Sequence, residues 1–229
     1  MSASELSIDT VFSIGPLAVT STSLTSSAVV AAIGLLAFLG TRRLKVDDPG
    51  MLQSALEGLV TVMQQAVDEV VPVERQRIGV FVASLWCYLV VANLVGLIPG
   101  LHSPTRDLSA TSALALLVFF STHWFGIRSQ GLGLYLRHYL SPTPLLLPFH
   151  IVSEITRTLA LAVRLFGNIM SLEMAALLIL VVAGFLAPVP ILMLHIVEAL
   201  VQAYIFGMLA LIYIAGGIQT QIHRQSRKE

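Results

Sequence analysis

The stretch LAVRLFGNIM, residues 161–170, places an arginine in the middle of one of the most apolar regions of the chain. The region from residue 151 to residue 196 has few charged or titratable side chains: Glu154, Arg157, Arg164, Glu173 and His195. An arginine at the centre of a bilayer helix costs about 2.5–3.5 kcal/mol on insertion scales. We therefore expect Arg164 to have a function that offsets this free energy.

Composition places the whole chain in a membrane. Of its 229 residues, 56% are hydrophobic and only 11% are charged, whereas a soluble domain has about 25% charged residues. We predict an integral membrane protein with a single membrane domain, residues 1–229. The zero net charge gives no argument for a nucleic-acid partner, and one cysteine, Cys87, excludes an internal disulfide and a cysteine metal cluster.

The apolar segments predict five membrane spans, because a helical span needs about 20 mostly apolar residues. Three separate spans are predicted at residues 17–40, 78–98 and 109–127. Residues 145–221 form a longer apolar region, interrupted at residues 184–190 by the turn-like sequence GFLAPVP. Each half exceeds the length that about 30 Å of hydrocarbon requires, so we expect a long helical hairpin that is steeply tilted.

A further helix is predicted at residues 49–71, where apolar side chains recur at spacings of three and four. These are Met51, Leu52, Ala55, Leu59, Val62, Met63, Ala66 and Val70. This pattern is typical of an amphipathic helix that lies at the membrane interface. A shorter amphipathic stretch is expected at residues 131–140. The predicted fold class is therefore all-α, with five transmembrane helices and one interfacial helix, the last two spans forming the tilted hairpin.

The positive charges predict the orientation. Ten Lys and Arg residues lie in the first and third polar loops and in the C-terminal tail, and the alternate loops contain only Arg106. The remaining two, Arg157 and Arg164, lie within a span. By the positive-inside rule we expect the N-terminus outside and the C-terminus in the cytoplasm, which five spans satisfy.

The polar residues of the hairpin occupy definite helix faces. At about 100° per residue, Arg164 and Asn168 share one face and Glu173 falls on the opposite face. On the last helix His195, Glu198 and Gln202 share one face. Because Glu173 and His195 both lie near the turn, we expect them to approach each other across the hairpin. Asn93 is a lone polar residue near the end of the second span.

These groups allow two interpretations. They could form structural ion pairs and hydrogen bonds between helices, or they could line an ion pathway. Glutamate and histidine suit proton relay because burial and neighbouring charges move their pKa values toward neutrality. Arginine stays charged and cannot pass a proton on. The sequence has no metal-binding or phosphate-binding motif, so we expect no metal, no cofactor and no catalytic residue.

The sequence LAVRLFGNIM, followed by Glu173 and by the long helix MLHIVEALVQAYIFGMLALIYI, resembles subunit a of the F-type ATP synthase membrane sector. The resemblance also includes DPGMLQSALEGLV and NLVGLIPG, and it covers most of the chain. It implies a non-catalytic, ion-translocating stator subunit, whose tilted hairpin curves against a rotating ring of c subunits. Arg164 matches the stator arginine that faces the carboxylates of the ring, between two offset aqueous half-channels.

The resemblance also implies roles for the other polar residues. Glu173, His195 and Gln202 match positions on the same two helices, where Glu and His form the relay of the outer half-channel. Glu198 is an additional carboxylate one turn from His195. Near the start of the hairpin, His150 stands where many relatives have a carboxylate, and Glu154 is displaced by one turn. The predicted ion pathway comprises Glu173, His195, Glu198, Gln202, Asn168, Glu154, His150 and Asn93.

The partners implied are the c-subunit ring, b-type peripheral stalk subunits, the remainder of the F1F0 complex and the lipid bilayer. The implied location is a bacterial inner membrane. The coupling ion is left open between H⁺ and Na⁺, and the Glu–His set favours H⁺. A secondary transporter is an alternative function, although we see no internal repeat or broken helix of the kind such transporters have. A structural scaffold is another, but it would not require Arg164.

Overall fold

The computed structural model describes residues 10–14, 17–42, 50–71, 75–98, 101, 103–133, 135, 147–184 and 189–219. Its long helices are α1 (Ser21–Thr41), α2 (Met51–Val70), α3 (Arg75–Val95), α4 (Leu108–Gln130), α6 (Leu147–Ala183) and α7 (Val189–Gln219). All except α2 are long and apolar enough to cross a membrane. The predicted all-α class with five spans is thus confirmed, whereas the assignment of the whole chain to one domain stays a prediction.

The N-terminal part contains a small β-hairpin that the sequence analysis did not predict. Strands β1 (Thr10–Ile14) and β2 (Leu17–Thr20) pair antiparallel. Residues 17–20, expected at the start of the first span, are therefore extended, and α1 begins at Ser21. The hydroxyl of Thr20 caps this helix by accepting a hydrogen bond from the Ser23 backbone N–H at 3.3 Å. Such short strands give too brief an alternation of polarity to be recognised in sequence.

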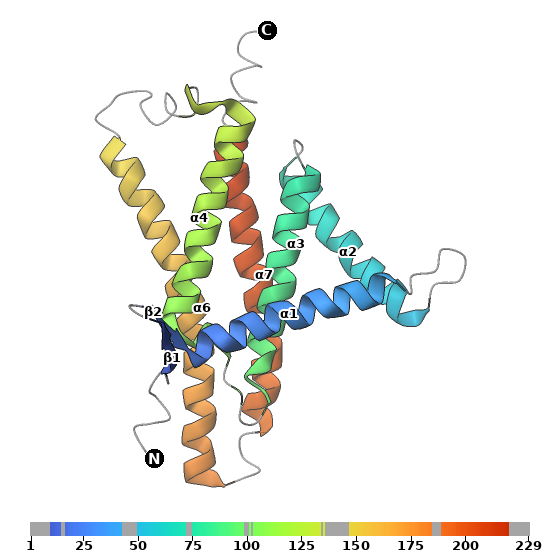
Figure 1. The fold of residues 1–229 in the computed structure, drawn as a ribbon, viewed down its shortest axis with the longest axis vertical. Helices are drawn as coiled ribbons and strands as arrows, with labels where there is room; N and C mark the ends of the chain where they lie inside the picture. The colour runs from blue at the N-terminus through green and yellow to red at the C-terminus, as the bar shows by residue number, and fades with distance from the viewer. Residues whose placement is uncertain are drawn as a thin grey trace.

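Four helices share the main core. Helix α3 packs against α7, α4 packs against both α6 and α7, and α6 contacts α7 along the hairpin (Figure 1). Their contact is made by aliphatic and aromatic side chains, among them Leu89, Val118, Leu161, Leu165 and Phe206. A second cluster joins α2, α3 and α7 through Val67, Ile78, Trp86 and Leu211. The polar groups discussed below are positioned by these packed helices.

The hairpin has the length predicted for it. Helix α6 has 37 residues, which at 1.5 Å per residue is about 55 Å, against about 30 Å of hydrocarbon. Helix α1 runs across the direction of α6 and α7 (Figure 1), so the two directions cannot both lie along the bilayer normal. If α1 crosses the bilayer directly, the hairpin must lie steeply inclined.

Glycines end two of these helices. Gly184 follows α6 with φ of +86°, and Gly131 follows α4 with φ of +77°. This left-handed conformation is strained for residues with a Cβ, so glycine is the residue that ends a helix most easily in this way. The predicted turn between the last two spans therefore begins where expected. Only residues 131–133 and 135 of the predicted amphipathic stretch at 131–140 lie within the described residues.

Helix α2 forms within the range predicted for an amphipathic helix. Near its C-terminal end Val67 is buried with Met63, Ala66 and Val70 beside it, whereas Met51 of the predicted apolar series is 92% exposed. The interfacial location of this helix stays a prediction.

A glycine on α7 allows a tryptophan to enter the core. A Cβ added at Gly207 would overlap the indole ring of Trp86 at its Nε1. The buried indole N–H donates to the backbone carbonyl of Tyr204 at 3.3 Å, and its ring stacks on that of Tyr204. The close approach of α3 to α7 at this point therefore requires glycine.

We predict that Gly207→Ala destabilises the subunit by about 1–3 kcal/mol, the usual cost of overpacking a core. Thermal unfolding of the purified full-length protein in detergent would measure it. Gly216→Ala on the same helix is the control, because nothing lies within 4 Å of its added Cβ. Equal thermal midpoints for the two variants would contradict the proposed packing constraint.

Candidate functional site

Arg164 lies on the outer face of the hairpin. Its side chain is exposed, and it makes no hydrogen bond or ion pair with any residue that the structure describes. The large side chains around it on α6, such as Leu159 and Val163, are also exposed, at 59% and 57%. Arg164 is therefore a charge without a partner on an open apolar surface.

One helical turn after Arg164, a side-chain bond joins the two helices of the hairpin. The amide Nδ2 of Asn168 donates to Oε1 of Gln202 at 2.7 Å. Gln202 is 2% exposed. The predicted faces of these two helices thus do meet, and the contact is a direct amide–amide hydrogen bond.

This bond divides the polar residues of the hairpin into two groups. Toward the turn at Gly184, Glu173 lies five residues beyond Asn168, and His195 lies seven residues before Gln202, which correspond to about 7.5 and 10 Å along the helices. We call this side the turn end of the hairpin. Toward the other side, where α6 begins and α7 ends, lie Glu154 and Arg157, and we call this the open end.

At the turn end, His195 belongs to a buried network. It is 3% exposed, and its Nε2 lies 3.3 Å from the backbone carbonyl of Asn93, to which it can only donate. The amide of Asn93 donates to the carbonyl of Ala199 at 3.3 Å. The hydroxyl of Thr105 donates to Oδ1 of Asn93 at 2.8 Å. Asn93 therefore connects α3 to α7 and to the segment before α4.

Ser103 extends this network. Its hydroxyl lies 2.8 Å from the carbonyl of Ala92 and 2.6 Å from the hydroxyl of Thr105. Each hydroxyl has a single proton, so these two protons cannot fill all three contacts made to Ala92, to Asn93 and between the hydroxyls. Three proton arrangements of the pair, each leaving one of these contacts unfilled, are therefore possible without movement of heavy atoms.

Glu173 lies beside the same network. Its Oε2 forms an ion pair with Nη1 of Arg106 at 3.3 Å, and its buried Oε1 has no hydrogen-bond partner among the described residues. A Cβ added at Gly96 would lie 3.1 Å from Oε1 and 3.1 Å from Cβ of Ser103. Glu173 and His195 form no hydrogen bond or ion pair with each other in the described part of the chain, because Glu173 pairs with Arg106 and His195 bonds to the Asn93 carbonyl. Their expected approach across the hairpin is therefore not a direct polar contact.

At the open end, a different cluster forms. Oε1 of Glu154 pairs with Nη1 of Arg157 at 3.2 Å, and the guanidinium of Arg157 lies 4.5 Å from the ring centroid of Tyr213. His150 is half-buried one turn before Glu154. The charge of Arg157 is therefore compensated, unlike that of Arg164.

Glu198 is half-buried between His195 and Gln202 along α7. It makes no hydrogen bond or ion pair within the described part of the chain. In that same part, no group of three or more His, Cys, Asp or Glu side chains could hold a metal ion.

Sequence reasoning missed Ser103, Thr105, Arg106 and Tyr213. The sequence did contain one signal for Arg106, because it is the only Lys or Arg in the loops on the side of the membrane predicted to be outside. The hydroxyl residues gave no signal, because serine and threonine are ordinary in a loop that precedes a helix.

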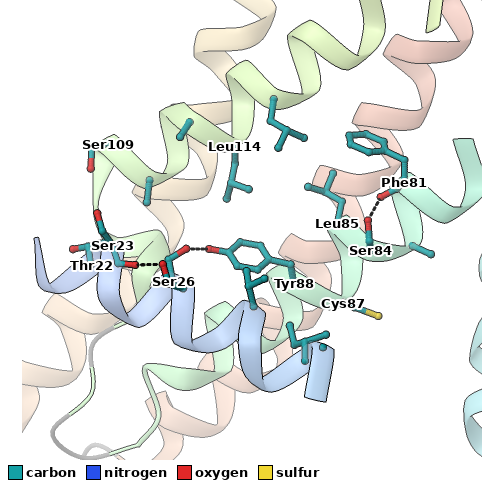
Figure 2. Close-up of a pocket in the computed structure, with 18 residues that line it drawn as sticks. Thr22, Ser23, Ser26, Phe81, Ser84, Leu85, Cys87, Tyr88, Ser109 and Leu114 are labelled. Atoms are coloured by element: carbon teal, nitrogen blue, oxygen red, sulfur yellow. Dashed lines mark hydrogen bonds between the residues drawn. The ribbon is translucent and has the colours of Figure 1, made fainter. Parts of the chain in front are cut away.

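A cavity lies elsewhere, among α1, α3 and α4. It has a volume of about 920 Å³, and none of the predicted ion-pathway residues lines it. Figure 2 shows Ser26 of α1 and Tyr88 of α3 pointing toward each other across it, with their oxygens 2.6 Å apart. This bond connects α1 to the rest of the bundle, away from Arg164.

A multi-pass membrane chain with a lone exposed arginine between two polar clusters has the features of an ion-conducting membrane subunit. Comparison with known proteins agrees. The family model described as ATP synthase A chain matches residues 23–215. The chain is 64% identical to "ATP synthase subunit a 2" of Pelobacter propionicus over 218 residues, 95% of each chain. It is 61% identical to "ATP synthase subunit a 1" of Hahella chejuensis over 90% of this chain and 87% of that one.

A third relative, "ATP synthase subunit a" of Legionella pneumophila, is 55% identical over 91% of this chain and 90% of its own. The chain belongs to the ATP synthase A chain family, subunit a of the F0 sector. It is the proton-translocating stator subunit rather than a catalytic subunit, so the resemblance stated from the sequence is confirmed. The transporter and scaffold alternatives do not apply.

We predict that Thr105→Val destabilises the subunit, because it leaves the buried Oδ1 of Asn93 without its donor at a cost of about 1–3 kcal/mol. The control is Thr122→Val. Thr122 is also buried, but its hydroxyl bonds only to the Val118 carbonyl of its own helix. Thermal unfolding of both variants within purified F0 would compare them, and a larger loss for Thr122→Val would argue against the network.

Proposed function

We propose that Arg164 faces the carboxylates of a c-subunit ring and separates two proton half-channels. The observation that carries this proposal is the exposed, unpartnered charge of Arg164 on an apolar surface. Such a charge is costly in lipid, and an anion supplied by another subunit would offset the cost. Only 11% of the α6 span is buried, against 50% of the α7 span, so α6 has the free surface for such a partner.

Each ring step would couple one proton to rotation. During ATP synthesis, a ring carboxylate beside Arg164 is an anion. It takes a proton from the outer half-channel, becomes neutral and moves into the lipid. A carboxylic acid arriving from the other side releases its proton into the inner half-channel and takes its place beside Arg164. The guanidinium stays charged throughout, so it cannot itself carry the proton across.

We assign the outer half-channel to the turn end of the hairpin. Glu173 and His195 lie there, and Glu198 lies between His195 and Gln202. The alternative proton arrangements of Ser103 and Thr105 support this assignment, since a proton can move along such hydroxyls by exchange of donors. Asn93 accepts from Thr105 through Oδ1 and from Nε2 of His195 through its backbone carbonyl, so it holds the imidazole near the hydroxyl pair without itself passing a proton.

We assign the inner half-channel to the open end, with His150 and Glu154 as its titratable groups. This assignment is supported by the position of Glu154 ten residues before Arg164, about 15 Å along α6. The two half-channels would then be offset along the hairpin.

The Asn168–Gln202 bond would help to close the direct route between the half-channels. It joins α6 to α7 beside Arg164, and the neighbouring Leu161 and Leu165 are buried between helices. A proton would therefore have to pass by way of the ring.

The further partners proposed are b-type peripheral stalk subunits and the remainder of the F1F0 complex. The chain is a multi-pass membrane protein. Its proposed location is a bacterial inner membrane, with the N-terminus outside and the C-terminus in the cytoplasm, as the charge distribution favours.

We predict that Arg164→Ala abolishes ATP synthesis and ATP-driven proton pumping in reconstituted complexes. Assembly should persist, because no described residue depends on the guanidinium and removal of a charge lowers the cost of insertion. Arg164→Lys should remain strongly impaired, since burial favours loss of the lysine charge and the planar fork is lost. ATP synthesis at the wild-type rate by assembled Arg164→Ala complexes would refute the stator role.

Cysteine labelling would test the orientation. Cys87 is exposed, so the background is Cys87→Ser. In it, an impermeant maleimide added outside intact cells should label Leu101→Cys, which is 45% exposed in the loop before α4. It should not label Ser226→Cys in the C-terminal tail. The opposite pattern would overturn the proposed orientation.

A further inference from the structure

The proton route proposed above gives Arg106 no role, yet Arg106 contacts Glu173, one of the groups on that route. Its Nη1 lies 3.3 Å from Oε2 of Glu173, and the two side chains are only 19% and 12% exposed. An ion pair that is largely removed from water is screened less than a surface pair. The contact is also non-local, since 67 residues separate the two partners.

The backbone that carries Arg106 is fixed on both sides. Arg106 ends the 3-10 helix η2 (Pro104–Arg106), in which Pro104 and Thr105 are buried. The hydroxyls of Ser103 and Thr105 attach this segment to the end of α3. After it, Asp107 caps α4 by accepting from the Ser109 N–H at 2.9 Å. The backbone that positions the Arg106 guanidinium is therefore held in place on both sides.

The two oxygens of Glu173 differ in their surroundings. Oε2 is held by Arg106, whereas Oε1 is buried, has no hydrogen-bond partner among the described residues and lies next to Gly96, which in turn packs against Ser103. The space for Oε1 exists because residue 96 is glycine: a Cβ there would already lie 3.1 Å from it. The carboxylate oxygen that Arg106 leaves without a bond is thus the one on the side of Gly96.

We propose that Arg106 is a positioning residue of the outer half-channel: by holding Oε2 of Glu173, it keeps Oε1 on the side of Gly96 and Ser103, near the hydroxyl pair that is bonded to Asn93. This inference rests on the proposed function of Glu173 as a relay group. Arg106 itself transfers no proton, since it remains charged. It acts through the orientation of the carboxylate and through its fixed positive charge.

The test is passive proton conductance of reconstituted F0 from which F1 has been removed, driven by a potassium diffusion potential and normalised to assembled subunit. We expect Arg106→Gln to lower conductance about tenfold. Arg106→Lys retains the charge and should recover at least a third of the wild-type rate. Arg106→Met is a second neutral replacement for use if Arg106→Gln does not accumulate. The matched control is Arg128→Gln, an exposed arginine in the last turn of α4, which should conduct as the wild type does.

Combination with Glu173→Gln separates positioning from a general structural role. If Arg106 acts through the carboxylate, then adding Arg106→Gln to Glu173→Gln should change conductance less than twofold. A further tenfold loss of conductance in the double variant would overturn the inference. Wild-type conductance of Arg106→Gln would also overturn it, and so would an Arg106→Lys variant that conducts no better than Arg106→Gln. Wild-type conductance of Glu173→Gln alone would instead refute the proposed relay, and the inference with it.

Discussion

An arginine keeps its charge, and an unpaired charge in hydrocarbon is costly in free energy. Much of this structure follows from that constraint. Arg157 satisfies it within the chain, through Glu154 and the ring of Tyr213. Arg106 satisfies it through Glu173. Arg164 has no such contact with the described residues. Of these three arginines, Arg106 and Arg157 are thus paired within the described residues and Arg164 is not, and the proposed mechanism depends on this difference.

The same constraint explains why the polar groups are grouped along the hairpin. A buried donor or acceptor without a partner costs about 1–3 kcal/mol, so polar side chains between packed helices gather where they can serve one another. Asn93 illustrates this, because its amide and its backbone carbonyl both bond to α7 while its Oδ1 accepts from Thr105. The clusters lie on either side of the Asn168–Gln202 bond, so the hairpin has a polar cluster toward each end and a single side-chain hydrogen bond between them.

Helix faces could be predicted from the sequence, but the partners of those faces could not. The apolar runs gave the spans, since hydrocarbon thickness sets their length. The 100° periodicity placed Arg164 and Glu173 on opposite faces, and in the structure one is exposed while the other packs against the segment before α4. That segment was not predictable, because its position depends on contacts such as the one between Arg106 and Glu173, which are remote in the chain. Glu173 and His195 were therefore expected to approach each other, whereas in the structure their polar partners are Arg106 and the Asn93 carbonyl. The β-hairpin was missed for a related reason, since it is stabilised by pairing of two very short segments.

The open apolar face of α6 has a consequence for movement. Around Arg164 it presents aliphatic side chains such as Ile155, Leu159 and Val163, all more than half exposed. Contacts between such groups are non-directional and weak per atom pair, so a surface sliding past them breaks no hydrogen bond and meets no deep energy minimum. In the proposed complex this face would act as a low-friction bearing, and Arg164 would be the only point on it where a passing subunit is held. Rotation would then be smooth everywhere except at the site where the proton is exchanged.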